Sequence, residues 1–307
     1  MRRLVAVTFA DPSMRPLRGI AFKLASVLVF MVMASMIKST ADHVPAGQTV
    51  FFRSFFAIPV IFVWLAVRRE LPGGLKTANP FGHFWRGLMG TLAMGFGFAG
   101  LGYLPLPEVT AIGYAAPLLT VIFAAMFLDE KVPLARGLAV LAGFGGVLLV
   151  LTPRLSVGVD GPEALAHALG AMLVLGSAVF AALAQVFVRK LLGSDRTPVI
   201  VFWFSVTSLA LSLVTLPFGW VVPGPSDALA LVLAGVVGGV AQILLTTSYR
   251  HADASVVAPF DYASMLVALL VGFFVFHEAP GPMVLAGAAV ISAAGLAVIW
   301  QEHRRPK

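Results

Sequence analysis

The 307-residue sequence contains no cysteine, which excludes disulfide bonds, thiolate metal sites and cysteine nucleophiles. It also has little charge, because only 11% of its residues are charged, whereas an average soluble domain carries about 25%. Hydrophobic residues make up 59% of the chain. This composition excludes an ordinary soluble enzyme or nucleic-acid-binding domain and, with 24 phenylalanines, a disordered chain. It is typical of a protein solvated mostly by lipid.

Ten continuous apolar runs are long enough to cross a bilayer as helices, which takes about 20 residues each. Short connections that contain proline and glycine separate these runs and leave no room for a soluble domain. The sequence therefore predicts an all-α integral membrane protein with ten transmembrane helices. The predicted spans are residues 18–39, 47–67, 82–102, 106–127, 134–151, 166–188, 199–217, 227–248, 254–276 and 282–300.

The positive charges are distributed unevenly between alternate connections. Of the 21 Lys and Arg residues, 18 fall on one side of the predicted membrane, with Lys23 and Arg86 included, and only Arg154 falls clearly on the other. Cytoplasmic loops are enriched in Lys and Arg, so we predict a multi-pass protein of the inner (plasma) membrane with both termini in the cytoplasm. The net charge of +7 is then a topology signal, and we expect no nucleic-acid partner.

A weak internal repeat pairs the fourth predicted span with the ninth. At an offset of 148 residues, Tyr114 aligns with Tyr262 and Glu130 with Glu278. The match divides the chain into two halves of five helices. Because five is odd, the second half enters the membrane from the opposite side, which predicts the inverted repeat that many secondary transporters use. The two halves are residues 1–152 and 153–307.

The segment Tyr103–Thr120, which reads YLPLPEVTAIGYAAPLLT, resembles the EamA family of the drug/metabolite transporter superfamily. The closing residues Leu128–Lys131 and the following span with Gly143, Gly145 and Gly146 are similar to that family too. The resemblance covers nearly the whole chain and implies ten spans and transport of a small metabolite by alternating access. Within the family, the chain looks most similar to amino-acid exporters of the YddG type. Riboflavin and S-adenosylmethionine transporters share the same general pattern.

Three charged residues within predicted spans are candidates for function, because a charge inside the bilayer is costly and needs a partner or a cavity. Asp261 lies roughly 10 Å inside the ninth span and is a candidate site for a substrate ammonium or a proton, or one member of a structural salt bridge. Arg53 in the second span and Lys38 near the outer end of the first are candidates to hold a carboxylate. Both long side chains could instead extend to the lipid headgroups.

Uncharged polar and aromatic residues supply the remaining candidates for substrate binding. Gln185 and Gln242 lie deep in the sixth and eighth spans, where an amide either lines the path or joins two helices. Tyr114 and Tyr262 occupy equivalent places in the two halves and offer a ring face and one hydrogen bond. Trp203, near the start of the seventh span, either stacks on a ligand or belongs to the interfacial aromatic belt.

No motif indicates a catalytic residue, a metal or a cofactor. The six histidines lie near span ends without the spacing of metal ligands, and the sequence has neither a Walker loop nor a nucleophile elbow. We therefore expect a transporter and not an enzyme. A lipid-modifying membrane enzyme would need a cluster of catalytic residues at the interface, which the sequence does not show.

The first hypothesis is an exporter or facilitator of aromatic or neutral amino acids. Asp261 would take the ammonium, Arg53 or Lys38 the carboxylate, and Tyr114 and Tyr262 the side chain. The second is an importer of a larger metabolite such as riboflavin or S-adenosylmethionine. The partners expected are a small-molecule substrate and the lipid bilayer. One buried acid is compatible with proton coupling, and a self-contained body with short loops favours a monomer.

Overall fold

The computed structural model describes residues 16–69, 71, 75–128, 134–155, 162–191, 194–251, 260–261 and 263–303. Within these residues the chain is all-helical and contains no strand, as the sequence predicts. The helices are α1 (Pro16–Thr40), α2 (Ala46–Val67), α3 (Pro80–Tyr103), α4 (Leu106–Gly113), α5 (Ala115–Leu128), α6 (Leu134–Leu155), α7 (Pro162–Leu191), α8 (Thr197–Ser212), the 3-10 turn η1 (Leu213–Thr215), α9 (Pro225–His251), α11 (Ala263–Val275) and α12 (Pro282–His303).

Six segments of the described chain are long and apolar enough to span a membrane. They are Leu17–Thr40, Ala46–Val67, Leu106–Phe127, Glu163–Val188, Pro198–Thr215 and Pro225–Leu245. Shorter apolar stretches lie in α6, α11 and α12. Helices cover most of the described residues of each predicted span, and residues 254–259 and 262 of the ninth lie outside the described residues. That ten helices cross the membrane remains a prediction from the sequence.

The fourth predicted span is broken into α4 and α5 at Tyr114. Pro117 has no backbone N–H, so it cannot donate to the carbonyl of Gly113 four residues earlier. The helix ends at Gly113, and the N–H of Tyr114 instead bonds to the carbonyl of Ala111 at 3.3 Å. Tyr114 lies at this break, where it is buried and its hydroxyl reaches Asp261 and Ser264.

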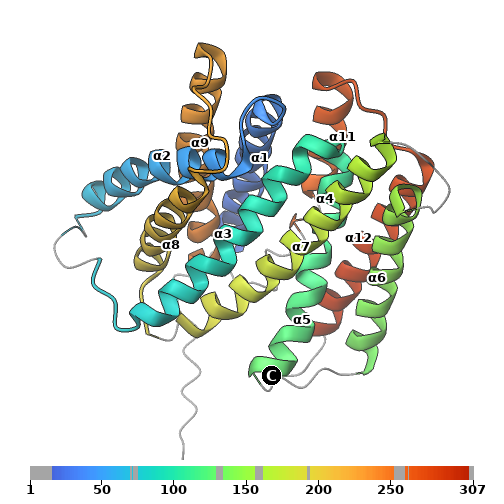
Figure 1. Cartoon of the computed structure of the whole chain (residues 1–307). Helices are drawn as coiled ribbons and strands as arrows, with labels where there is room; N and C mark the ends of the chain where they lie inside the picture. Colours follow the sequence, from blue (N-terminus) through green and yellow to red (C-terminus); the bar gives the residue numbers. More distant parts are fainter. Residues whose placement is uncertain are drawn as a thin grey trace, which may run out of the picture.

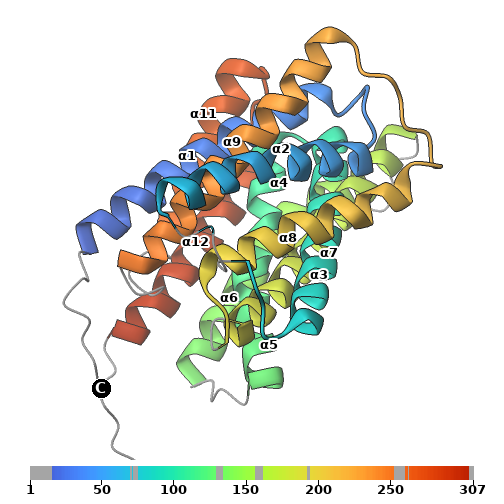
Figure 2. The same ribbon diagram turned by 90° about the vertical axis from the view of Figure 1, so that its left-hand side faces the viewer.

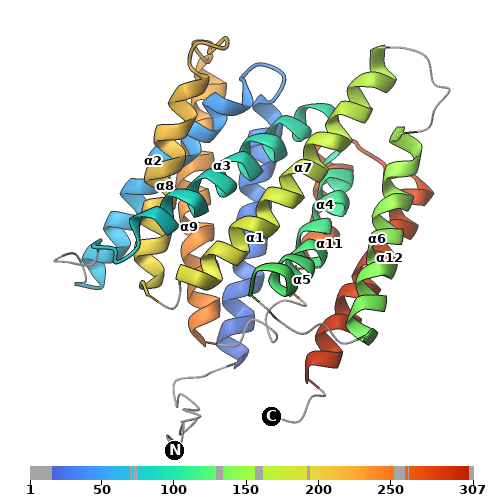
Figure 3. The same ribbon diagram turned by 60° about the horizontal axis from the view of Figure 1, so that its bottom comes forward.

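The long helices α3 and α7 run side by side across the molecule (Figure 1). Helices α1, α2, α8 and α9 pack together on one side of this pair, and α5, α6 and α12 lie on the other (Figures 1 and 2). The backbones of α6 and α12 are in close contact at two glycines. A Cβ atom added to Gly287 would lie only 2.6 Å from the carbonyl oxygen of Gly146. The start of α1 and the end of α12 lie at the same end of the bundle (Figure 3).

Candidate functional site: a central cavity with charged groups at its ends

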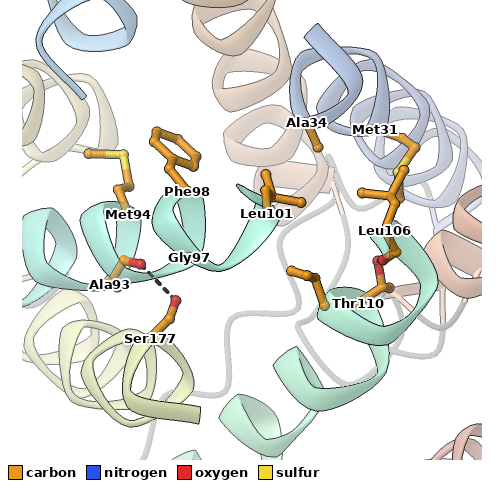
Figure 4. A pocket seen from close by; sticks show the side chains of 11 residues that line it. Met31, Ala34, Ala93, Met94, Gly97, Phe98, Leu101, Leu106, Thr110 and Ser177 are labelled. Atoms are coloured by element: carbon orange, nitrogen blue, oxygen red, sulfur yellow. Dashed lines mark hydrogen bonds between the residues drawn. The ribbon is translucent and has the colours of Figure 1, made fainter. Parts of the chain in front are cut away.

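A cavity of about 330 Å³ lies where α1, α3, α4 and α7 meet. Its walls are almost entirely apolar, and Figure 4 shows their side chains. The two hydroxyl groups in the wall are already engaged, because Ser177 donates to the carbonyl of Ala93 at 2.7 Å and Thr110 to that of Leu106 at 2.9 Å. The cavity thus suits an apolar group. The lining residues are Met31, Ala34, Ala93, Met94, Gly97, Phe98, Leu101, Leu106, Val109, Thr110 and Ser177.

Lys38 and Glu278 form an ion pair beside the cavity, at the end of the bundle where α1 ends. The Nζ of Lys38 lies 2.9 Å from Oε1 of Glu278 and donates to the carbonyls of Leu104 at 2.9 Å and Leu101 at 3.2 Å. These three contacts use all three N–H groups of the ammonium. Lys38 therefore donates hydrogen bonds to backbone carbonyls at the end of α3 that have no partner within the helix. Leu101 also lines the cavity, so the pair is attached directly to the cavity wall.

The other oxygen of Glu278 holds the start of α4. Oε2 accepts a hydrogen bond from the N–H of Leu106 at 2.8 Å, and Leu106 is the first residue of α4. Such N–H groups have no partner inside their own helix, and an acid near them is favoured by the helix dipole. The repeat alignment of Glu278 with Glu130 did not predict this long-range contact. Lys38 and Glu278 together join α1, α3, α4 and the segment after α11, and we call them the Lys38–Glu278 clasp.

Asp261 pairs with Lys23 near the start of α1. The Nζ of Lys23 lies 2.6 Å from Oδ1 of Asp261, and the lysine side chain is 3% exposed while the aspartate side chain is 48% exposed. Lys23 is thus a buried residue inside α1, seven residues after the helix begins. Asp261 keeps one side open, as a residue that binds a substrate or a proton requires.

The hydroxyl of Tyr114 reaches the segment that contains Asp261. It lies 2.6 Å from Oγ of Ser264 and donates to the carbonyl of Asp261 at 3.2 Å. Ser264 in turn donates to the same carbonyl at 2.6 Å. The break between α4 and α5 therefore contacts Asp261 and the start of α11, and two of the predicted site residues, Tyr114 and Asp261, come together here. Tyr262 lies outside the described residues.

Arg53 lies in α2 and is 3% exposed. Its guanidinium carbon stands 5.4 Å from the ring centroid of Phe204 in α8, and that of Arg86 in α3 stands 3.8 Å from the same centroid. Arg86 was counted with the positive charges on one side of the membrane, although it lies inside the predicted span 82–102. Helix α3 starts at Pro80, capped by the Asn79 side chain, and Arg86 follows six residues later.

The remaining predicted residues, like Lys38, Asp261, Tyr114 and Arg53 above, are not among the residues that line the cavity. Trp203 donates from its indole Nε1 to the carbonyl of Leu75 at 3.0 Å, which ties α8 to the connection between α2 and α3. Gln242 is half-buried on α9, and Gln185 is exposed on α7. None of the three is among the residues that line the central cavity. Their part in substrate binding stays a prediction.

Asp195 forms a second buried polar cluster, between α7 and α8. Its carboxylate accepts from the N–H of Ala78, from Thr77 and from Ser194, and it lies 3.2 Å from Nε2 of His83. Burial alone would raise the pKa of this carboxyl, but the hydrogen bonds outweigh burial, so the pKa of Asp195 lies below its ordinary value. The cluster holds the start of α3 against the turn that leads into α8.

The variant Asp195→Asn should lose about 2 kcal/mol of stability at neutral pH, because it loses the charge that strengthens these hydrogen bonds. A carboxyl with a lowered folded pKa stabilises the protein above its unfolded pKa, and this contribution is lost as the pH falls through the folded value. The difference in Tm between wild type and variant should therefore stay constant down to about pH 4 and shrink only below it. Thermal unfolding measured across pH checks this, and a difference that shrinks between pH 8 and 6 would contradict it.

Comparison with known proteins shows which family this chain belongs to. The sequence pattern of the EamA-like transporter family matches residues 17–152 and again residues 168–301. The chain belongs to the EamA-like transporter family. Two matches within one chain mean that this EamA-like transporter contains the family's unit twice, and the central cavity takes α1, α3 and α4 from the first match and α7 from the second. The chain is thus a membrane transporter and not an enzyme.

Three curated relatives of this EamA-like transporter are themselves named as transporters, and each aligns with it over most of its own length. A pseudopaline exporter of Pseudomonas aeruginosa is 29% identical, over 91% of this chain and 95% of its own. An S-adenosylmethionine uptake transporter of Rickettsia bellii is 26% identical, over 92% and 97%. A riboflavin transporter of Rhizobium johnstonii is 29% identical, over 95% and 91%. One solved crystal structure aligns with a TM-score of 0.66 at 22% identity over 93% of this chain and 98% of its own, which shows the shared fold.

Proposed function

We propose that this EamA-like transporter moves an amino acid or a similar small metabolite through the central cavity by alternating access, as an exporter or facilitator. The observation that carries the proposal is the cavity itself, because it lies between both copies of the family's unit and beside a break in a helix. Its volume is at the lower end of the range for small-molecule pockets, which favours a small substrate over a large planar one.

The proposed mechanism uses the two halves, residues 1–152 and 153–307, as an inverted repeat. Halves of opposite orientation can pack in two ways of nearly equal energy, each open to one side of the membrane. With both termini in the cytoplasm, the Lys38–Glu278 clasp lies at the outer end and the Lys23–Asp261 pair at the inner end. The clasp would then close the outer route in this conformation, and opening it would release the substrate outward.

The named relatives include both an exporter and an uptake transporter at similar identity. The direction proposed here therefore rests on the resemblance to amino-acid exporters, and import of a larger metabolite is the alternative, favoured by the riboflavin relative. Expression in matching auxotrophs separates the two. Growth on external riboflavin or S-adenosylmethionine that depends on this protein would support import and contradict the export proposal.

Uptake into sealed proteoliposomes tests the proposed function directly. The purified protein is reconstituted and given a mixed panel of amino acids, nucleosides and vitamins, with and without an imposed pH gradient, and the contents are read by mass spectrometry. We expect amino acids to enter, and levelling at equal concentrations without a gradient identifies a facilitator. Accumulation above equality under a pH gradient identifies proton coupling. Uptake of a vitamin or nucleoside with no amino-acid uptake would overturn the substrate class.

A further inference from the structure

Arg53, which is buried, and Arg86, which is half-buried with two buried guanidinium nitrogens, share one aromatic ring. The guanidinium carbons of Arg53 and Arg86 lie 5.4 and 3.8 Å from the ring centroid of Phe204. Among the described residues neither arginine forms a hydrogen bond or an ion pair, and buried nitrogens of both, Nε of Arg53 and Nε and Nη1 of Arg86, lack a partner. An arginine inside a protein is normally paired with a carboxylate, so two neighbouring arginines without one need an explanation.

The aromatic ring does not compensate for this burial. Burying an ion costs more free energy, even after relaxation, than a desolvated cation–π contact contributes. The two positive charges also repel each other. The arrangement is therefore unfavourable without an anion, and a planar guanidinium is well suited to bind the paired oxygens of a carboxylate or a phosphate.

The arginine pair is close to the central cavity along two helices. Gly90 packs against both Arg86 and Phe204, because a Cβ there would lie 2.3 Å from Nη1 and 2.6 Å from the ring. Ala93 and Met94, which line the cavity in Figure 4, follow on the same helix about one turn later. Arg53 approaches α1 through Gly238 of α9. A Cβ atom added to Gly238 would contact both the Sδ of Met33 and the Nε of Arg53. Met33 neighbours the cavity-lining stretch of α1.

We propose that Arg53, Arg86 and Phe204 form an oxyanion subsite that takes a carboxylate or phosphate group of the transported metabolite. The apolar part of the metabolite lies in the central cavity, and its oxyanion lies between the two guanidinium groups. The inference rests on the proposed function and narrows it, because it makes an oxyanion the recognised group. It also predicts that substrates without an amino group bind, provided they carry the oxyanion.

Thermal unfolding of the full-length protein in detergent tests the subsite at constant ionic strength. The probes are L-leucine and L-leucinamide, which differ only at the carboxylate, together with succinate and inorganic phosphate. Leucine and succinate should raise the Tm while leucinamide does not, which identifies a carboxylate site. A rise with phosphate alone identifies a phosphate site. Equal shifts with leucine and leucinamide, or no shift with any probe, would overturn the proposal.

The variants Arg53→Gln and Arg86→Gln separate binding from a purely structural role. We expect each to weaken probe binding by about tenfold to a hundredfold. Without probes, their Tm should equal or exceed that of wild type, because each removes a buried charge that has no partner. A Tm that falls in both variants while probe binding is retained would show that the stack only holds α2, α3 and α8 together, and would refute the subsite.

Arg68→Gln is the matched control. The Arg68 guanidinium carbon also stands over an aromatic ring, 5.5 Å from the centroid of Trp64, but the residue is exposed at the end of α2. Its removal should leave probe binding unchanged. Transport in proteoliposomes keeps the two proposals apart. Probe binding that depends on the arginines without any transport contradicts the proposed function alone, whereas transport with an unchanged KM in both arginine variants contradicts the subsite alone.

Discussion

The Glu278→Gln variant should open the end of the cavity that the Lys38–Glu278 clasp holds and should lose most of its transport. The change leaves the Lys38 ammonium, which is 13% exposed, without its counter-ion. Removing one partner of a buried pair costs about 3 kcal/mol where both side chains keep some exposure. That is roughly a hundredfold change in a two-state conformational equilibrium. A transporter that rests in one conformation cycles slowly, so transport falls although the site is intact.

A single introduced thiol measures this opening. Because the chain has no cysteine, Thr110→Cys places the only thiol in the wall of the cavity, one turn from Leu106. We expect maleimide to label this thiol roughly tenfold faster or more in Glu278→Gln than in the wild-type background. Equal labelling rates would show that the clasp does not govern access to the cavity.

Two controls distinguish loss of the clasp from loss of charge in general. His43 and Asp227 form a more exposed pair between the end of α1 and the start of α9, with 3.5 Å between Nδ1 and Oδ2. Exposed pairs contribute little, so Asp227→Asn should leave labelling unchanged. The double variant Lys38→Met with Glu278→Leu removes both charges and should label more slowly than Glu278→Gln, because no unpaired ammonium remains.

The helices of this protein follow from its sequence because a lipid-embedded chain must satisfy its backbone inside each helix. The break at Tyr114 also follows from local chemistry, since Pro117 removes one helical hydrogen bond. Lys23 and Arg86 were counted with the positive flank although both lie inside the predicted spans 18–39 and 82–102. They lie seven and six residues after Pro16 and Pro80, the first residues of α1 and α3.

The partners of the charged residues could not be predicted in the same way. Lys38 and Glu278 are 240 residues apart, and no periodicity along the chain relates them. The sequence showed that a charge inside a span needs a partner, but several carboxylates and carbonyls could serve equally well. Only the packing of α1 against α3 and α11 selects Glu278 for Lys38. The same holds for Phe204, which receives two arginines from two other helices.

The Asp261→Asn variant should be expressed and folded but should lose most of its transport. Asparagine keeps the size of the side chain and one acceptor oxygen, so only the negative charge is removed. Lys23, whose side chain is 3% exposed, then lacks the carboxylate that it contacts at 2.6 Å. The exposed side of residue 261 also no longer carries the negative charge that could bind a substrate ammonium or a proton. Uptake of the preferred amino acid into proteoliposomes, with and without a pH gradient, measures the loss. Full uptake in this variant would exclude Asp261 as a binding or proton-carrying residue.

A double variant shows which of the two effects causes the loss. In Lys23→Met with Asp261→Asn no ammonium remains at position 23, so a defect due only to the lost Lys23–Asp261 contact should disappear. If Asp261 binds the substrate ammonium or carries the proton, the Tm recovers in the double variant while transport stays low. Asp261→Glu should then keep part of the transport, because it restores the charge at a slightly different position. Recovery of both Tm and transport in the double variant would instead assign the Lys23–Asp261 pair a purely structural role.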